Sequence, residues 1–232
     1  MTIHFKEDGK MKLTKLFPVL AFFSMLVSCT LTPFGGDAPE DGLPEETAVI
    51  EGESSFYTED DDGGRYIFET NDTRYMNDVG FTVWTTNHVN ESDAFEPITV
   101  SLSKESGRSE AGYGIVFCSR EIDGKPFLLT VLINTKGMYT AGKVVDGVFS
   151  HINGGWKNSN YINRGYGIKN EMTVSFDSGK KNFLLSINGY EVAAFTAPEK
   201  MEFKDSRSGF VVVIAGNEDL PKTPVKVSFE KK

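Results

Sequence analysis

From Arg65 to the C-terminus, apolar and polar residues alternate with a period of two, and this alternation constrains the fold more than any other feature. Residues 172–176 read Met-Thr-Val-Ser-Phe, and the same alternation recurs at 98–102 and 225–229. Successive side chains of a β-strand point to opposite faces, so each segment predicts a half-buried strand. No window of ten or more residues has the period of an amphipathic helix, and the pattern therefore predicts an all-β domain.

Two apolar runs and a set of turn signals complete this prediction. Residues 127–133 and 210–214 are almost continuously apolar, as expected of strands that are covered on both faces. Asn188-Gly189 lies between two strand patterns and predicts a tight hairpin. The other turn signals are Asp123-Gly124, Lys136-Gly137, Asp146-Gly147 and Ser178-Gly179. About a dozen short strands in one domain predict a two-sheet antiparallel β-sandwich.

The N-terminal 28 residues have the composition of a secretory signal peptide. Basic residues precede an apolar run of twelve residues, 16–27, which is followed by Ser28 and Cys29. A membrane-spanning helix needs roughly 20 apolar residues, so this run is too short for a stable anchor. Residues 1–10 place two acidic residues before the signal, which makes Met11 a better candidate for the true start than Met1.

The sequence Leu26-Val27-Ser28-Cys29 resembles the lipobox of bacterial lipoproteins. The resemblance implies that Cys29 is linked to diacylglycerol and becomes the N-terminus of the mature chain. The protein would then be anchored to a lipid bilayer of the bacterial cell envelope, at the outer membrane or the cell surface. An ordinary signal peptide with a coincidental cysteine and a buried N-terminal helix remain as alternatives.

Residues 29–55 are interpreted as a flexible acidic linker and residues 56–232 as the folded domain. The segment 30–64 contains eleven Asp or Glu and no Lys or Arg, and it has too few apolar residues to form a core. Asp60, Asp61 and Asp62 are consecutive, so they do not present one face to a calcium ion, and we interpret them as a solvated turn. No metal or cofactor is expected.

Charge and cysteine content exclude several functions. The chain has a net charge of −9, and removal of residues 1–28, with four Lys and two acids, makes it −11. Such a chain is repelled by nucleic acid. If Cys29 is acylated, Cys118 is the only thiol, so no disulfide forms, and a buried apolar role is favoured over a nucleophile. His88 and His151 are interpreted as surface-loop residues that do not make a zinc site. The domain is expected to be a monomer.

A series of motifs along the domain resembles a known fold family. Strand-like segments at 111–117 and 127–134 precede Gly137-Met-Tyr-Thr-Ala-Gly-Lys143, then Gly155-Trp156, then a strand–Asn-Gly hairpin. This series resembles the concanavalin A-like, laminin-G-like jelly roll of bacterial envelope proteins over residues 65–230. The resemblance implies the fold but leaves function open, because the family includes glycan binders, adhesins, glycosidases and inert spacers.

The glycosidases of that family carry alternating acids on one strand, so that two carboxylates flank a sugar bond. The nearest match in this chain is Glu121-Ile122-Asp123, which continues with Gly-Lys-Pro and has no third acid. Gly-Lys-Pro favours a hairpin turn over a strand that lines a groove. No catalytic residue is therefore expected, and the protein is predicted not to be an enzyme.

One stretch, residues 154–166, combines aromatic, amide and guanidinium groups, which together bind sugar rings and their hydroxyls. The candidate ligand-binding residues are Trp156, Asn158, Asn160, Tyr161, Arg164 and Tyr166. Alternatively, Trp156 packs against the sandwich edge and the asparagines are turn residues. We expect a non-catalytic recognition domain with a glycan as its favoured ligand. The alternatives are an envelope glycoside hydrolase active on polysaccharide and a protein–protein interaction or adhesin module.

Overall fold

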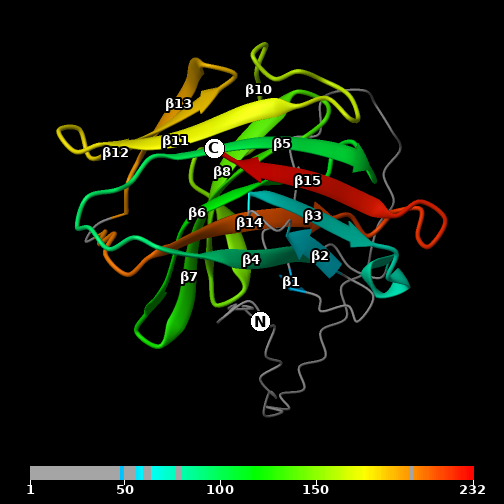
Figure 1. Cartoon of the computed structure of the whole chain (residues 1–232), viewed down its shortest axis with the longest axis horizontal. Helices are drawn as coiled ribbons and strands as arrows, with labels where there is room; N and C mark the ends of the chain where they lie inside the picture. Colours follow the sequence, from blue (N-terminus) through cyan, green and yellow to red (C-terminus); the bar gives the residue numbers. More distant parts are fainter. Residues whose placement is uncertain (1–47, 50–55, 60–63, 77–79, 199–200) are drawn as a thin grey trace.

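A computed structural model describes residues 48–49, 56–59, 64–76, 80–198 and 201–232, which form two stacked β-sheets (Figure 1). Sheet I has the strand order β1-β4-β14-β6-β7-β8-β10, and β9 also pairs with β8. Its strands are β1 (Ala48–Val49), β4 (Gly80–Val89), β14 (Arg207–Ile214), β6 (Tyr113–Ile122), β7 (Lys125–Ile133), β8 (Met138–Val145), β9 (Val148–His151) and β10 (Lys157–Asn158).

Sheet II has the strand order β13-β12-β11-β5-β15-β3-β2. Its strands are β13 (Tyr190–Thr196), β12 (Asn182–Ile187), β11 (Asn170–Asp177), β5 (Ile98–Ser106), β15 (Val225–Lys231), β3 (Arg65–Thr70) and β2 (Phe56–Glu59). A short 3-10 helix, η1 (Thr73–Met76), follows β3. All described strand pairs are antiparallel except β1 with β4. The prediction of an all-β, two-sheet sandwich is confirmed.

The burial of the strands follows the sequence pattern. In β15 Val225, Val227 and Phe229 are buried, and in β11 Met172 and Val174 are buried and Phe176 is partly buried, which the alternation at 172–176 and 225–229 predicted. In β7 residues 127–133 are all buried, and in β14 residues 208–214 are all buried. The prediction that these two apolar runs are covered on both faces is therefore confirmed.

The main core lies between the two sheets and is rich in phenylalanine. Phe183 of β12 is at its centre, with ring centroids 4.8 Å from Phe117 and 5.4 Å from Phe95. These ring pairs are edge-to-face, the arrangement that aromatic quadrupoles favour. The core therefore joins sheet II to β6 of sheet I and fixes how the sheets stack.

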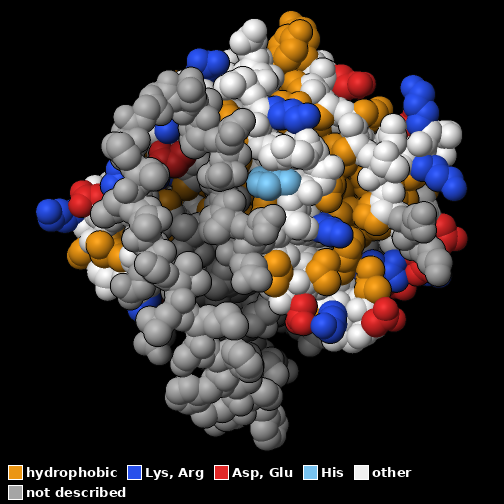
Figure 2. Space-filling view, turned by 180° about the vertical axis from the view of Figure 1, so that it is seen from behind, with side chains coloured by type: hydrophobic (Ala, Val, Ile, Leu, Met, Phe, Trp, Pro, Cys, Tyr) orange, Lys and Arg blue, Asp and Glu red, His pale blue; other side chains and the backbone are white. Residues whose placement is uncertain are grey.

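A second apolar cluster lies on the outer face of sheet I. It contains Phe81, Val83, Val116, Leu128, Leu132, Val144, Phe149, Val211 and Val213, with Trp156 packed against it. These residues alternate along their strands with residues of the main core, so they point away from sheet II. Figure 2 shows the molecule from behind, where hydrophobic side chains are visible among polar ones, but the cluster residues themselves are at most 8% exposed. Both faces of sheet I are apolar.

Of the five turn signals, three have the expected positive φ at both residues, Lys136-Gly137 has it at Gly137 alone, and Ser178-Gly179 has it at neither residue. Asp123-Gly124, Asp146-Gly147 and Asn188-Gly189 have positive φ at both residues, as expected of tight two-residue turns. Between β11 and β12 the positive φ falls on Lys181 instead of Gly179. Asp177 Oδ1 accepts hydrogen bonds from the amides of Gly179 and Lys180 there, so the Asp side chain organises this turn.

Several sequence interpretations fall on other parts of the chain. The signal segment, Cys29, most of the linker and Asp60–Asp62 lie outside the described residues. Within the segment assigned to the linker, β1 pairs with the first residues of β4. No helix among the described residues is long and apolar enough to cross a membrane. The surface-loop interpretation of the two histidines is wrong, because His88 lies in β4 and His151 ends β9.

Candidate functional site

The loop 159–169 connects β10 to β11 and carries most of the candidate residues. Three asparagines fix its first half. The backbone N–H of Asn163 donates to Asn170 Oδ1 at 2.8 Å, and Asn188 Nδ2 donates to the same oxygen at 2.8 Å. Asn188 Nδ2 also donates to the Tyr161 carbonyl at 2.7 Å. The loop is thereby tied to the β12–β13 hairpin, in which Asn188 lies.

Two backbone hydrogen bonds fix the second half of the loop. The Gly165 amide donates to the Thr135 carbonyl at 3.0 Å, just after β7 of sheet I. The Gly167 amide donates to the Lys104 carbonyl at 2.8 Å, in β5 of sheet II. The loop therefore bridges both sheets at one end of the sandwich and holds its side chains in defined positions.

Tyr161 stacks on Tyr190, the first residue of β13. Their ring centroids are 4.5 Å apart with an interplanar angle of 14°. The side chains remain 46% and 57% exposed, respectively. Each ring covers one face of the other, so the remaining ring faces and edges meet solvent. This Tyr161–Tyr190 pair is an exposed aromatic platform on a rigid support.

Tyr166 lies at the other end of the loop. Its hydroxyl donates a hydrogen bond to the Gly107 carbonyl, and the residue is 47% exposed. Burial of the hydroxyl, together with the carboxylates of Glu218 and Glu110, raises the pKa of Tyr166. The hydroxyl is thus held as a neutral donor, which fixes the ring above the loop at Gly107.

The polar candidates Asn158, Asn160 and Arg164 are all exposed. The stem of Arg164 passes over Gly137, where an added Cβ would lie 2.6 Å from Arg164 Nε. Gly137 also has a φ of 88°, so both its space and its backbone favour glycine. Arg164 is therefore positioned by packing on the turn between β7 and β8.

Trp156 has different surroundings. It is half-buried and packs against the apolar cluster on the outer face of sheet I. An added Cβ at Gly112 would lie 2.9 Å from the Trp156 ring, so the glycine makes room for the indole. Trp156 Nε1 is buried and has no hydrogen-bond acceptor among the described residues. The structure thus joins Tyr161 to Tyr190 and places Trp156 in an apolar environment.

The remaining chemical candidates are separate from one another. Glu121 and Asp123 are exposed at the β6–β7 hairpin. Cys118 is buried, and burial raises its pKa to about 11, which disfavours the thiolate. His151 is half-buried beside Thr140, with 2.7 Å between its Nδ1 and Thr140 Oγ1, and burial lowers its pKa. No three His, Cys, Asp or Glu residues in the described ranges cluster as a metal site.

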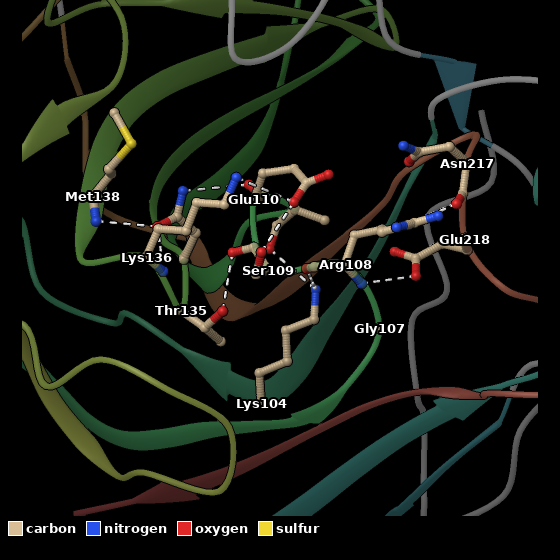
Figure 3. Close-up of polar contacts among 12 residues, drawn as sticks. Lys104, Gly107, Arg108, Ser109, Glu110, Thr135, Lys136, Met138, Asn217 and Glu218 are labelled. Carbon is tan, nitrogen blue, oxygen red and sulfur yellow. Dashed lines mark hydrogen bonds and ion pairs between the residues drawn. The ribbon is translucent and has the colours of Figure 1, made fainter. Parts of the chain in front are cut away.

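A buried polar cluster that the sequence did not point to lies around the loop 107–111 (Figure 3). Lys104 is fully buried, and its Nζ donates to the carbonyls of Arg108 at 2.7 Å and Ala111 at 3.1 Å. Burial lowers the Lys104 pKa to about 8. The Arg108 amide donates to Glu218 Oε2 at 2.8 Å, and burial raises the Glu218 pKa. The cluster braces the loop on which Tyr166 is fixed.

Sequence reasoning missed three residues of this region, Tyr190, Glu218 and Lys104. Tyr190 follows the Asn188-Gly189 turn, and an aromatic residue directly after such a turn was a usable signal. Glu218 lies in a loop of ordinary composition, and it accepts a hydrogen bond from Arg108, which is 110 residues away in the chain. No signal in the sequence alone indicates that contact.

Comparison with known proteins gives similarity in solved structures only. No family model and no curated protein matches the chain. The carbohydrate binding module CBM66 from Bacillus subtilis is 9% identical, covering 69% of this chain and 89% of its own, with a TM-score of 0.39. The Bacteroides ovatus mixed linkage glucan PUL GH16 protein is 10% identical, covering 81% and 89%, with a TM-score of 0.47. Sheep galectin-11 is 9% identical, covering 66% and 97%, with a TM-score of 0.36.

Proposed function

We propose that this domain is a non-catalytic glycan-binding module and that the Tyr161–Tyr190 pair is its sugar-stacking platform. The observation that carries the proposal is the parallel stack of two half-exposed tyrosines, 4.5 Å apart, on a hydrogen-bonded loop. The apolar face of a pyranose ring packs on such an aromatic surface, and phenolic hydroxyls and nearby amides supply hydrogen bonds. Because the loop is already ordered, little conformational entropy is lost on binding.

The placement of the acids supports binding without hydrolysis. A glycosidase needs two carboxylates on opposite sides of one sugar bond. Glu121 and Asp123 are exposed at the β6–β7 hairpin. We therefore propose recognition as the function and not hydrolysis.

We also propose that the module is held at the bacterial envelope through acylated Cys29. The support is the order of basic head, apolar run, small residue and cysteine in residues 12–29. Cys29→Ser should abolish incorporation of an alkyne fatty acid into the whole chain and leave an unprocessed precursor. Continued labelling of the Ser variant would refute the anchor.

The glycan proposal is tested by titrating the whole chain with a panel of neutral linear tetrasaccharides of β1,4-gluco, β1,3-gluco and β1,4-manno type. One aromatic contact contributes on the order of 1–3 kcal/mol, so Tyr190→Ala should weaken binding by roughly ten- to a hundredfold. Tyr190→Phe keeps the ring and should stay within about threefold. Absence of binding to every member, or equal affinity of wild type and Tyr190→Ala, would refute the proposal.

A further inference from the structure

A cavity of about 360 Å³ opens beside Tyr166, at the far end of the loop from Tyr161. Its lining residues are Gly107, Arg108, Tyr166, Glu218, Asp219 and Thr223. They come from three segments: the loop after β5, the loop 159–169, and the connection between β14 and β15. Tyr166 is half-exposed over it, with its hydroxyl donated to the Gly107 carbonyl.

Glu218 is one of the residues that line this cavity, and one of its carboxylate oxygens is buried without a hydrogen-bond donor in the part of the chain that the structure describes. The side chain is 3% exposed, and its Oε2 accepts the Arg108 amide at 2.8 Å. Its Oε1 is buried and has no hydrogen-bond donor among the described residues. Lys104 is the nearest buried cation, but it donates to two carbonyls, and no ion pair joins it to Glu218. A buried acceptor without a donor is unfavourable, so this oxygen favours a ligand that can donate to it.

The surrounding charges define which donor fits. Two cations, Lys104 and Arg108, and two carboxylates, Glu218 and Asp219, lie at or beside the cavity, so no strong net charge attracts an ion. The described residues include no group of three acids that could hold a cation. A neutral hydroxyl can donate to Glu218 Oε1, and the Thr223 hydroxyl, which donates to Asp219 Oδ2 at 3.4 Å, can still accept a hydrogen bond. The ring of Tyr166 supplies an apolar wall. These features together fit a sugar ring.

We propose that this cavity is a second sugar subsite, in which Glu218 accepts a hydroxyl and Tyr166 packs against the ring. The inference rests on the proposed function and extends it. Tyr161 and Tyr166 are five residues apart on one ordered loop, which spans at most about 18 Å even when fully extended. The ligand is therefore an oligosaccharide that lies along the loop 159–169, with one unit at the Tyr161–Tyr190 pair and another at the Tyr166–Glu218 cavity.

The test uses the whole chain and the same tetrasaccharide panel, together with glucose and mannose as single sugars. Glu218→Gln keeps the size of the side chain but replaces a carboxylate oxygen by an amide group. We expect it to weaken tetrasaccharide binding about tenfold or more, because hydrogen bonds to charged acceptors are the strong ones. Tyr166→Ala should have a similar effect, whereas Tyr166→Phe, which keeps the ring but loses the hydrogen bond to the Gly107 carbonyl, should have a smaller effect than Tyr166→Ala. Wild type should bind tetrasaccharides more tightly than single sugars.

Failure of this inference is distinct from failure of the proposed function. If Tyr190→Ala weakens binding while Glu218→Gln and Tyr166→Ala do not, the cavity is not a subsite and the stacking platform stands. If Glu218→Gln lowers the melting temperature with affinity unchanged, Glu218 only maintains the fold and the inference is wrong. If no sugar of the panel binds wild type, both proposals fail. Tyr166 is half-exposed, so its variants test the cavity even where Glu218→Gln does not fold.

Discussion

The outer faces of the two sheets differ in chemistry although both belong to the same sandwich. The outer face of sheet I is formed by aliphatic and phenylalanine side chains that are almost completely buried. The outer face of sheet II carries hydroxyls and charges. Thr99 pairs with Thr173 at 3.0 Å and Ser103 with Ser228 at 3.1 Å, and Lys226 forms an ion pair with Glu69 at 2.9 Å.

This difference shows that two strand patterns coexist in one domain. A strand with one solvated face alternates, as β11 and β15 do, whereas a strand with two apolar faces reads as a continuous run, as β7 and β14 do. Cross-strand hydroxyl pairs and exposed ion pairs each add only a few tenths of a kcal/mol to about 1 kcal/mol. Apolar side chains that are buried contribute several times more. The two outer faces should therefore respond differently to the same substitution.

Leu128 and Leu184 allow that comparison with identical chemistry. Leu128 is fully buried on the outer face of sheet I, and Leu184 is half-buried on the outer face of sheet II. Leu128→Ala should lower the free energy of unfolding by about 2–5 kcal/mol, because it leaves a cavity. Leu184→Ala should lower it by about 1 kcal/mol or less.

Urea denaturation of both variants and the wild type measures these values. Equal losses for Leu128→Ala and Leu184→Ala would remove the distinction between the outer faces. A small loss at both positions would mean that the apolar face of sheet I is not packed in solution.

The strands and most turns were predictable because their causes are local. Period-two alternation and Asn-Gly or Asp-Gly turns act within a few residues, and both appear in the structure where the sequence placed them. The β11–β12 turn was less predictable. Its sequence offers Ser178-Gly179, but Asp177 organises the backbone and leaves the positive φ to Lys181.

The candidate site was predictable only in part, because it depends on contacts between distant segments. The composition of 154–166 pointed to the loop that carries Tyr161 and Tyr166. It could not separate Trp156, which packs on sheet I, from Tyr161, which stacks on a residue 29 positions later. Glu218 and Lys104 were missed for the same reason, since their burial depends on how the loop 107–111 meets the β14–β15 connection.

Substitution of Trp156 tests whether this residue belongs to the apolar cluster on the outer face of sheet I or to the ligand site. Because it is half-buried against that face, Trp156→Ala should lower the free energy of unfolding by about 2–3 kcal/mol, somewhat less than for a fully buried tryptophan. Tetrasaccharide affinity should remain within about twofold of wild type. Trp156→Phe, which retains an aromatic ring, should lose about half as much stability. Lost affinity with unchanged stability would instead assign Trp156 to the ligand site.

Lys104 extends the comparison of sheet faces to the inner face of sheet II, where this charged residue is fully buried. Burial lowers its pKa from 10.5 to about 8, although the carboxylates of Glu218 and Glu110 oppose the shift. Between about pH 8 and 10.5 the unfolded chain therefore binds more protons at this residue than the folded one, and stability contributed by Lys104 rises with pH. Relative to Lys104→Met, wild type should gain about 1 kcal/mol in unfolding free energy between pH 7 and pH 9.

The difference between the two proteins matters because Cys118, whose pKa is raised to about 11, lowers the stability of both above pH 9. Parallel pH profiles for wild type and Lys104→Met in urea denaturation would show that Lys104 is solvated, and that the inner face of sheet II is open at this end of the sandwich.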